Sequence, residues 1–174
     1  MKFKVGSKVF YPSHGAGYIK RKKEIEFDGK KKEYFEFELV TNPLSISTPI
    51  DNVENLGIRD VMPVDDLKKI IKILKKTPNV NPKVRDFNMM IKLFKELEES
   101  PNTDASIQII QYCNYVKDKR KKEGRLIPIT LEKQLEAAIA NLVGELAVSS
   151  DISLKDASDM FSKLSGIKVD VTKE

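Results

Sequence analysis

Residues 18–40 read YIKRKKEIEFDGKKKEYFEFELV, and their alternation of apolar and polar side chains decides the fold of the first third of the chain. The Asp-Gly pair at 28–29 is among the strongest sequence signals for a tight hairpin turn. In the second half of the stretch, Phe35, Phe37 and Leu39 fall on one face of a strand, with polar residues between them. The stretch therefore predicts two antiparallel strands joined by a hairpin.

Working outward from this hairpin, the same period of two continues from the N-terminus to about residue 50. The expected strands are residues 9–11, 18–27, 33–40 and 44–48. We expect Pro12–Gly17 to be a loop, because proline lacks a backbone donor and glycine allows positive φ. Pro49 suits a strand end or an exposed edge. Four or five short strands in this length predict a small SH3-like or Tudor-like β-barrel over residues 1–62.

From Pro63 onward the hydrophobic period changes to about 3.6, which is typical of amphipathic helices. Thr130 is the expected N-cap of the fourth helix, and Ser153 the N-cap of the last. The expected helices cover about residues 65–76, 87–99, 104–122, 131–146 and 153–164. The predicted fold is α+β: a small N-terminal barrel, followed over residues 63–174 by an all-α domain of about five helices.

Composition excludes several kinds of site. The 174 residues include one His, one Cys and no Trp, so neither an intrachain disulfide nor a Cys/His zinc site can form. His14 has no activating neighbours, and we expect no catalytic, cofactor-binding or metal-binding residues. No window resembles a signal peptide or a membrane span, which indicates a cytoplasmic protein. Four aromatic residues of the N-terminal part could form either the barrel core or a ligand cage, and we expect them to form the core. They are Tyr11, Tyr34, Phe35 and Phe37.

Charge is concentrated in the middle of the chain. Residues 63–130 carry 15 basic and 9 acidic side chains, whereas residues 131–174 carry 5 and 8. The densest cluster lies at one helix end: Lys117, Lys119, Arg120, Lys121, Lys122 and Arg125. Cations at a helix C-terminus are favourable in any protein, but six exceed what capping requires. Phosphate backbones are the commonest partner of such a cluster, and acidic protein surfaces are the next.

Residues 3–17, FKVGSKVFYPSHGAG, resemble the opening of the bacterial CarD family, also called CdnL, and of the RNA-polymerase-interacting module of transcription-repair coupling factor. The similarity continues through Thr48-Pro49 and LGIRDV at 56–61. Further on, LEK at 131–133 and LVGELA at 142–147 also look like the C-terminal helices of CarD. The helical half makes the organisation of the chain similar to that of CarD.

This resemblance implies a cytoplasmic bacterial transcription regulator that works as a monomer without a cofactor. Residues 1–62 would bind the RNA polymerase β subunit, and residues 63–174 would contact promoter DNA largely independently of sequence, stabilising the open complex. The polymerase-binding candidates are Ile25, Phe27, Ser47 and Pro49. The DNA-binding candidates are chosen by charge and spacing, except Lys133, which is added because of the resemblance. They are Lys83, Arg85, Lys92, Lys119, Arg120, Lys121, Lys122, Arg125 and Lys133.

Two departures from the family pattern matter. Relatives often carry Arg at the positions of Ile25 and Ser47, so this chain would rely on strand pairing and apolar contact instead. Relatives also often carry a Trp in the segment matching residues 80–82, where it wedges against the minor groove, and this chain has none. Phe87, or another apolar residue near the start of the helix expected over residues 87–99, would have to take the place of this Trp. The alternative function is a protein-only adaptor whose basic helical face binds an acidic protein partner.

Overall fold

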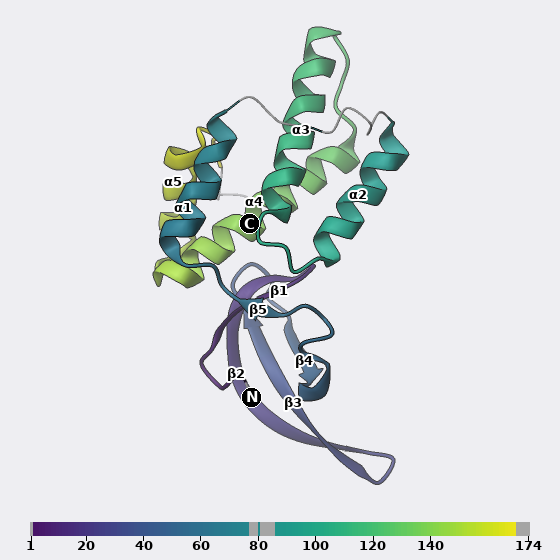
Figure 1. The fold of residues 1–174 in the computed structure, drawn as a ribbon, viewed down its shortest axis with the longest axis vertical. Coiled ribbons are helices and arrows are strands. Elements are labelled where there is room, and N and C mark those ends of the chain that lie inside the picture. The colour runs from purple at the N-terminus through teal and green to yellow at the C-terminus, as the bar shows by residue number, and fades with distance from the viewer. Residues whose placement is uncertain (1, 77–79, 81–85, 170–174) are drawn as a thin grey trace.

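A computed structural model describes residues 2–76, 80 and 86–169. The molecule is elongated, with a β-sheet at one end and a group of helices at the other (Figure 1). The strands are β1 (Lys8–Tyr11), β2 (Gly15–Phe27), β3 (Lys30–Leu39), β4 (Ser45–Pro49) and β5 (Arg59–Asp60). They form one antiparallel sheet in the order β4-β3-β2-β1-β5. The predicted α+β class and the N-terminal antiparallel sheet are confirmed.

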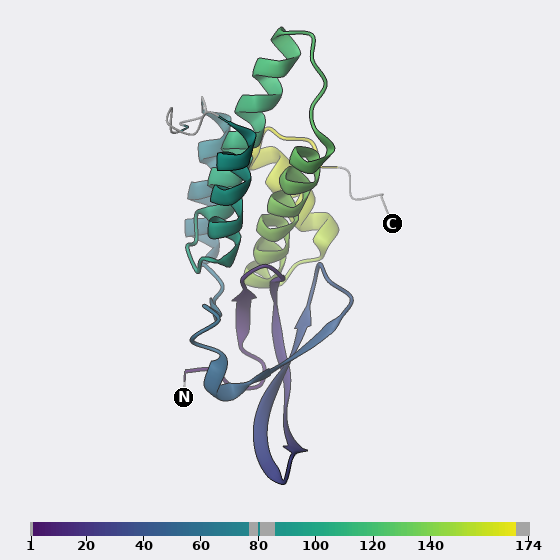
Figure 2. The ribbon, with the colours of Figure 1, turned by 90° about the vertical axis from the view of Figure 1, so that its right-hand side faces the viewer.

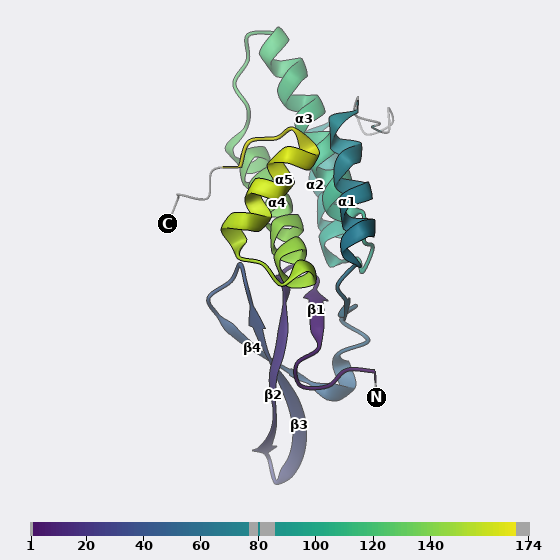
Figure 3. The same ribbon diagram turned by 90° about the vertical axis from the view of Figure 1, so that its left-hand side faces the viewer.

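The hairpin between β2 and β3 forms as predicted. Phe27 pairs with Lys30 across the turn, and the two residues between them adopt positive φ values, 53° for Asp28 and 72° for Gly29. Positive φ at both central residues is the requirement of the turn that suits right-twisted strands. The paired strands extend beyond the rest of the sheet as a two-stranded arm at the end of the molecule farthest from the helices (Figures 1 and 3).

The prediction of a loop over Pro12–Gly17 was too long. β2 already begins at Gly15, and the turn that connects it to β1 covers only residues 12–14. Gly17 pairs with Val9 on one side and Leu39 on the other. A Cβ atom at Gly17 would clash with the carbonyl oxygen of Glu38, so glycine here permits a close strand approach rather than a loop.

Three of the four aromatic residues expected in the core of the sheet are found there, and Tyr34 is not. Tyr11, Phe35 and Phe37 are buried, and Tyr34 is half-buried. The Tyr11 and Phe37 rings meet edge to face with centroids 5.4 Å apart. The Tyr11 hydroxyl shares a hydrogen bond of 3.1 Å with Thr48 on β4, which satisfies both buried oxygens. These rings are therefore occupied by packing rather than arranged around an open cage.

The helices are α1 (Val64–Lys72), α2 (Phe87–Glu99), α3 (Ala105–Lys122), α4 (Ile129–Ser150) and α5 (Leu154–Ser165). The Ser153 side chain accepts from the Asp156 amide at 3.1 Å, so the predicted cap of the last helix is confirmed. The expected cap at Thr130 was wrong, because α4 begins at Ile129, two residues earlier than predicted, and Pro128 is its N-cap. The carbonyl of Pro128 accepts from the Leu131 and Glu132 amides, and the fixed φ of proline prepares this start.

The helices enclose a hydrophobic core centred on α4. Phe94 of α2, Ile110 of α3 and Leu142 of α4 are each at most 1% exposed. Cys113 lies in this core, and burial raises the pKa of its thiol to about 12. The thiol is therefore protonated and shielded at neutral pH.

The sheet and the helices are joined by a buried ion pair between β5 and α4. Arg59 donates to both carboxylate oxygens of Glu145, at 2.6 and 3.1 Å. The Glu145 side chain is 2% exposed, and it also accepts from the Met62 amide at 2.8 Å. The Arg59 guanidinium lies 4.4 Å from the centre of the Phe10 ring on β1. One carboxylate therefore holds both an edge strand and the chain segment that leads into α1.

Apolar contacts continue this junction on both sides of the ion pair. Val148 of α4 is fully buried against Phe10 and Ala16 of the sheet. Gly144 lies so close to residues 40–41 that a Cβ atom there would stand 3.0 Å from the Thr41 methyl group. Figure 2 shows that the lower end of α4 rests directly on the ends of β1 and β2.

Removing one partner of this buried pair should cost stability. We expect Glu145→Ala to lower the free energy of unfolding by about 3 kcal/mol, because it leaves a buried guanidinium without its counter-charge. Urea titration followed by circular dichroism measures this loss. Glu132→Ala, at an exposed position on the same helix, is the control and should change stability by less than about 0.5 kcal/mol. Equal stabilities of the two variants would contradict the assigned role of Glu145.

Candidate binding surfaces

The arm and the edge strand β4 form the first candidate surface. β4 is the last strand of the sheet and pairs only with β3. Along an edge strand, alternate residues direct backbone donors and acceptors outward, so β4 presents groups that another strand can pair with. Of the four residues expected here, Phe27 is 81% exposed and Ser47 is exposed, while Ile25 and Pro49 are half-buried. All four lie on the arm or on β4.

Basic side chains on the arm and the sheet are largely neutralised by acidic neighbours. The pairs within 4.0 Å are Lys20–Glu38, Arg21–Glu36, Lys22–Glu33, Lys23–Glu36, Lys31–Glu24 and Lys32–Asp51. Exposed pairs of this kind add little stability, but they reduce the positive charge that would otherwise attract phosphate. Glu36 is shared by Arg21 and Lys23, so the six cations face five carboxylates. Acidic neighbours therefore compensate most of the positive charge on this surface.

Glu36 is the most tightly held acid of this surface. It lies on β3 opposite Ser47, and its Oε2 accepts from Arg21 at 2.8 Å and from Lys23 at 3.1 Å. The hydrogen bond from Arg21, followed by that from Lys23, lowers the pKa of the Glu36 carboxyl below 4.5. The side chain is consequently ionised throughout the neutral range. It holds the two cations of β2 against β3, the strand that pairs with the edge strand β4.

The C-terminal end of α3 is the second candidate surface. α3 projects beyond the other helices, and its end lies at the opposite pole of the molecule from the arm (Figures 1 and 2). Lys117, Lys119, Lys121 and Lys122 are exposed. Within the described parts of the chain, the only cation of this cluster with an acidic partner within 4.0 Å is Arg125, which is 3.5 Å from Glu123. The cluster is therefore a patch of mostly uncompensated positive charge.

The end of α3 is rigidly closed. The Gly124 amide donates to the Lys121 carbonyl at 3.2 Å, and the Arg125 amide donates to the Arg120 carbonyl at 2.8 Å. Gly124 has a φ of 69°, which completes the hydrogen-bond pattern of a Schellman C-cap. The Arg120 guanidinium then donates to the Leu126 carbonyl at 3.0 Å, so this half-buried cation also supports the following loop.

The remaining DNA-binding candidates are more dispersed. Lys92 is exposed on α2, and Lys133 is exposed in the first turns of α4, which starts back from the projecting end of α3 (Figure 2). Lys83 and Arg85 lie outside the described residues. The structure thus places Lys119, Arg120, Lys121, Lys122 and Arg125 at one helix end, whereas Lys92 and Lys133 lie on other helices.

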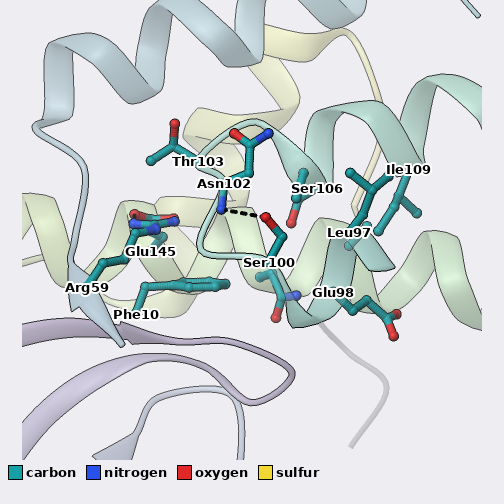
Figure 4. Close-up of a pocket in the computed structure, with 13 residues that line it drawn as sticks. Phe10, Arg59, Leu97, Glu98, Ser100, Asn102, Thr103, Ser106, Ile109 and Glu145 are labelled. Carbon is teal, nitrogen blue, oxygen red and sulfur yellow. Dashed lines mark hydrogen bonds and ion pairs between the residues drawn. The ribbon is translucent and has the colours of Figure 1, made fainter. Parts of the chain in front are cut away.

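A small cavity lies at the junction between sheet and helices, beside the Arg59–Glu145 pair (Figure 4). Its volume is about 20 Å³, which is enough for a single water molecule.

Residues 2–76, 80 and 86–169 contain no group of three His, Cys, Asp or Glu side chains that could hold a metal ion. In the same residues no single helix is long and apolar enough to cross a membrane, although α4 and α5 pass such a test together as a bent pair.

The role of Arg59 and Glu145 was missed by the sequence analysis. Both residues lie in stretches quoted above for their resemblance, but no contact between them was anticipated. A signal was present, because Glu145 interrupts the apolar run 142–148 on the buried face of a helix. A charged residue in such a place is almost always paired. Its partner, 86 positions away, could not be identified from spacing.

Residues 3–62, which include the whole sheet, match the CarD-like/TRCF RID domain model. The similarity to known proteins extends beyond the domain. The chain is 26% identical over 156 residues to a Bacillus subtilis (strain 168) protein named "Putative transcription factor YdeB", covering 88% of this chain and 95% of that protein.

The pKa of Glu36 reports directly on the β2 cations that bind this carboxylate. We expect Arg21→Ala to raise this pKa towards 4.5, because the larger of the two stabilising hydrogen bonds is lost. Since the folded-state pKa lies below the unfolded value, the stabilisation is complete above about pH 4.5. It disappears as the pH falls through the folded-state pKa.

Carbon-detected NMR of the glutamate carboxyl groups measures this pKa. Lys31→Ala, which removes a cation paired with Glu24 instead, should leave the Glu36 titration unchanged. The same pKa in Arg21→Ala and in the wild type would show that Arg21 does not control this carboxylate.

Proposed function

We propose that this protein regulates transcription by bridging RNA polymerase and promoter DNA. In this proposal the sheet of residues 1–62 docks on the polymerase β subunit, and the helical residues 63–174 contact DNA upstream of the melted region. The observation that carries the proposal is the contrast between the two ends of the molecule. Most cations of the arm are paired with acids, whereas those at the end of α3 are mostly uncompensated.

Docking on polymerase is supported by the domain family and by the chemistry of the edge. An exposed edge strand can extend a partner sheet through main-chain hydrogen bonds. Phe27, at the tip of the arm, adds an apolar contact that needs no matching charge. Ile25 and Ser47 carry no charge, so this interface would depend on strand pairing and apolar burial. The affinity of such an interface would depend less on salt concentration than that of an interface built on arginine ion pairs.

DNA contact is supported by the uncompensated lysines of α3. Neutralising phosphates releases counterions, so affinity should fall steeply with salt and depend little on sequence. A protein attached to polymerase in this way can favour the open complex merely by binding it better than the closed complex. A preference of about 1.4 kcal/mol changes the ratio of open to closed complex tenfold, and no catalytic residue is required.

The salt dependence of duplex binding tests the phosphate contacts. For wild-type protein, a plot of log K against log salt concentration should be steep. The double variant Lys121→Ala/Lys122→Ala should reduce its slope by about 2, because each lost phosphate contact accounts for about 1. Fluorescence anisotropy of a labelled duplex provides the measurement.

The matched control is Lys22→Ala/Lys31→Ala on the arm, where both lysines are already paired with glutamates. Its slope should equal that of the wild type. A flat slope for wild-type protein would contradict DNA binding. Together with retained polymerase binding, it would favour the protein-only adaptor.

The lifetime of the open complex tests the whole proposal. Wild-type protein should lengthen this lifetime on a single promoter, as measured by challenge with a competitor. Phe27→Glu should abolish the effect at moderate protein concentration, because a buried carboxylate at the arm tip weakens docking. Val5→Glu, at another exposed apolar position of the N-terminal part, should behave as the wild type. An unchanged lifetime with wild-type protein that demonstrably occupies polymerase would refute the mechanism.

A further inference from the structure

An open groove lies where the turn between α4 and α5 stands over the helix-facing end of the sheet (Figure 3). Its volume is about 510 Å³, which is in the range of sites that enclose a ligand or a side chain of a partner. Its walls are mostly apolar and come from the end of β3 and from the start of α5: Leu39, Val40, Ile152 and Leu154. Among the described residues that line the groove, only Glu38 is charged. The groove is therefore an apolar recess that contains one negative charge.

Glu38 belongs to a row of side chains that crosses four strands. The strand register places four residues opposite one another in turn: Ser45 of β4, Glu38 of β3, Tyr18 of β2 and Lys8 of β1. Residues directly opposite one another in antiparallel strands share a face of the sheet. Ser45 is small and lies on the free edge, so it leaves Glu38 accessible from that side. The row therefore leads from the exposed edge strand to the acid in the groove.

The charge of Glu38 is only loosely compensated. In the part of the chain that the structure describes, its one ion pair is with Lys20, whose Nζ lies 3.7 Å from the carboxylate, and both side chains are more than half exposed. Lys8, in the same row, is held by Asp151 at 2.6 Å instead. Glu36, two residues before Glu38 on β3, is enclosed by two shorter ion pairs and is 8% exposed. Of the two acids, Glu38 is the one that a cation from outside can reach.

The groove and its row fit a long cationic side chain from a strand that lies beside β4. Such a strand would run about 10 Å from β3, which is two strand spacings. Arginine is long enough to reach across Ser45 and meet the Glu38 carboxylate, whereas short polar side chains are not. The apolar walls would cover its methylene stem. The Tyr18 ring, next to Glu38 in the row, offers a face on which a guanidinium can stack.

We propose that Glu38 and Tyr18 receive an arginine side chain from the protein segment that pairs with β4. This inference rests on the proposed docking of the sheet on RNA polymerase, and it names the side chain that the partner must supply. The contact is separate from that of Phe27, because Phe27 pairs with the first residue of β3 and Glu38 lies near its last. It adds one charged contact, partly shielded from water, to the strand pairing along β4.

Binding to core RNA polymerase, measured by biolayer interferometry, tests this contact. Glu38→Gln keeps the size of the side chain but loses its charge, and it should weaken binding about tenfold. Glu38→Lys should weaken binding further, because it repels the cation of the partner. The matched control is Glu132→Gln in the first turn of α4, which changes the net charge equally and should bind as the wild type. Folding is not at risk, because both glutamates are exposed.

Photo-crosslinking identifies the residue of the partner. Lys20→Cys, at an exposed position beside Glu38, can be labelled selectively with benzophenone-maleimide because Cys113 is buried. Mass spectrometry of the crosslinked polymerase should locate a β-subunit segment that contains an arginine. Replacing this arginine by glutamine in polymerase should weaken binding of the wild type about tenfold and have no further effect on Glu38→Gln.

Each other outcome gives a clear answer. Equal affinities of wild type and Glu38→Gln for polymerase would overturn the inference and leave the proposed docking intact. A crosslinked segment without arginine, or additive effects of the two substitutions, would also overturn it. A wild-type protein that does not bind polymerase would refute the docking itself, and the inference with it. A dimer that depends on Glu38, with polymerase binding unchanged, would assign the groove to a second copy of the chain.

Discussion

The ion pair between Arg59 and Glu145 is the interaction on which the arrangement of this molecule depends. It links the short edge strand β5 to the middle of the core helix α4, and Glu145 also holds the amide of Met62 just before α1 begins. A buried ion pair is not in itself a strong source of stability, because both charges lose their hydration. Its geometry is nevertheless demanding, and we infer that its contribution lies in fixing one orientation of the helices on the sheet.

This fixed orientation gives the molecule two distant ends with different surface chemistry. At one end, the arm and β4 offer a strand edge and an exposed phenylalanine, with cations that are paired with acids. At the other, α3 carries lysines that are mostly uncompensated. We infer that such a body suits a connector between a protein and a polyanion.

Local sequence patterns predicted most elements of the fold. The Asp28-Gly29 turn, the alternating strand after it and the cap at Ser153 each depend on residues adjacent in sequence. The errors arose where distant residues or backbone groups decide the outcome. Gly17 is glycine because β3 passes close by, and α4 starts from the Pro128 carbonyl rather than from the Thr130 hydroxyl.

The candidate surfaces could be predicted only in part. The cluster at Lys119–Lys122 was predictable from the sequence, since consecutive residues at a helix end must lie close together. Ion pairing across strands was invisible in the sequence, so nothing there distinguished the neutralised lysines of the arm from the uncompensated ones of α3. The Arg59–Glu145 pair joins residues 86 positions apart and was likewise inaccessible.

If the sheet and the helices form one rigid body, the distance between β4 and α3 must be fixed, and it can be measured. Nitroxide labels at Ser45→Cys and Lys117→Cys, both exposed, can be attached selectively because Cys113 is buried. Pulsed electron–electron resonance should give one narrow distance distribution, unchanged when duplex DNA is added, and Glu145→Ala should broaden it. A broad or multiple distribution in the protein with intact Arg59 and Glu145 would contradict the account.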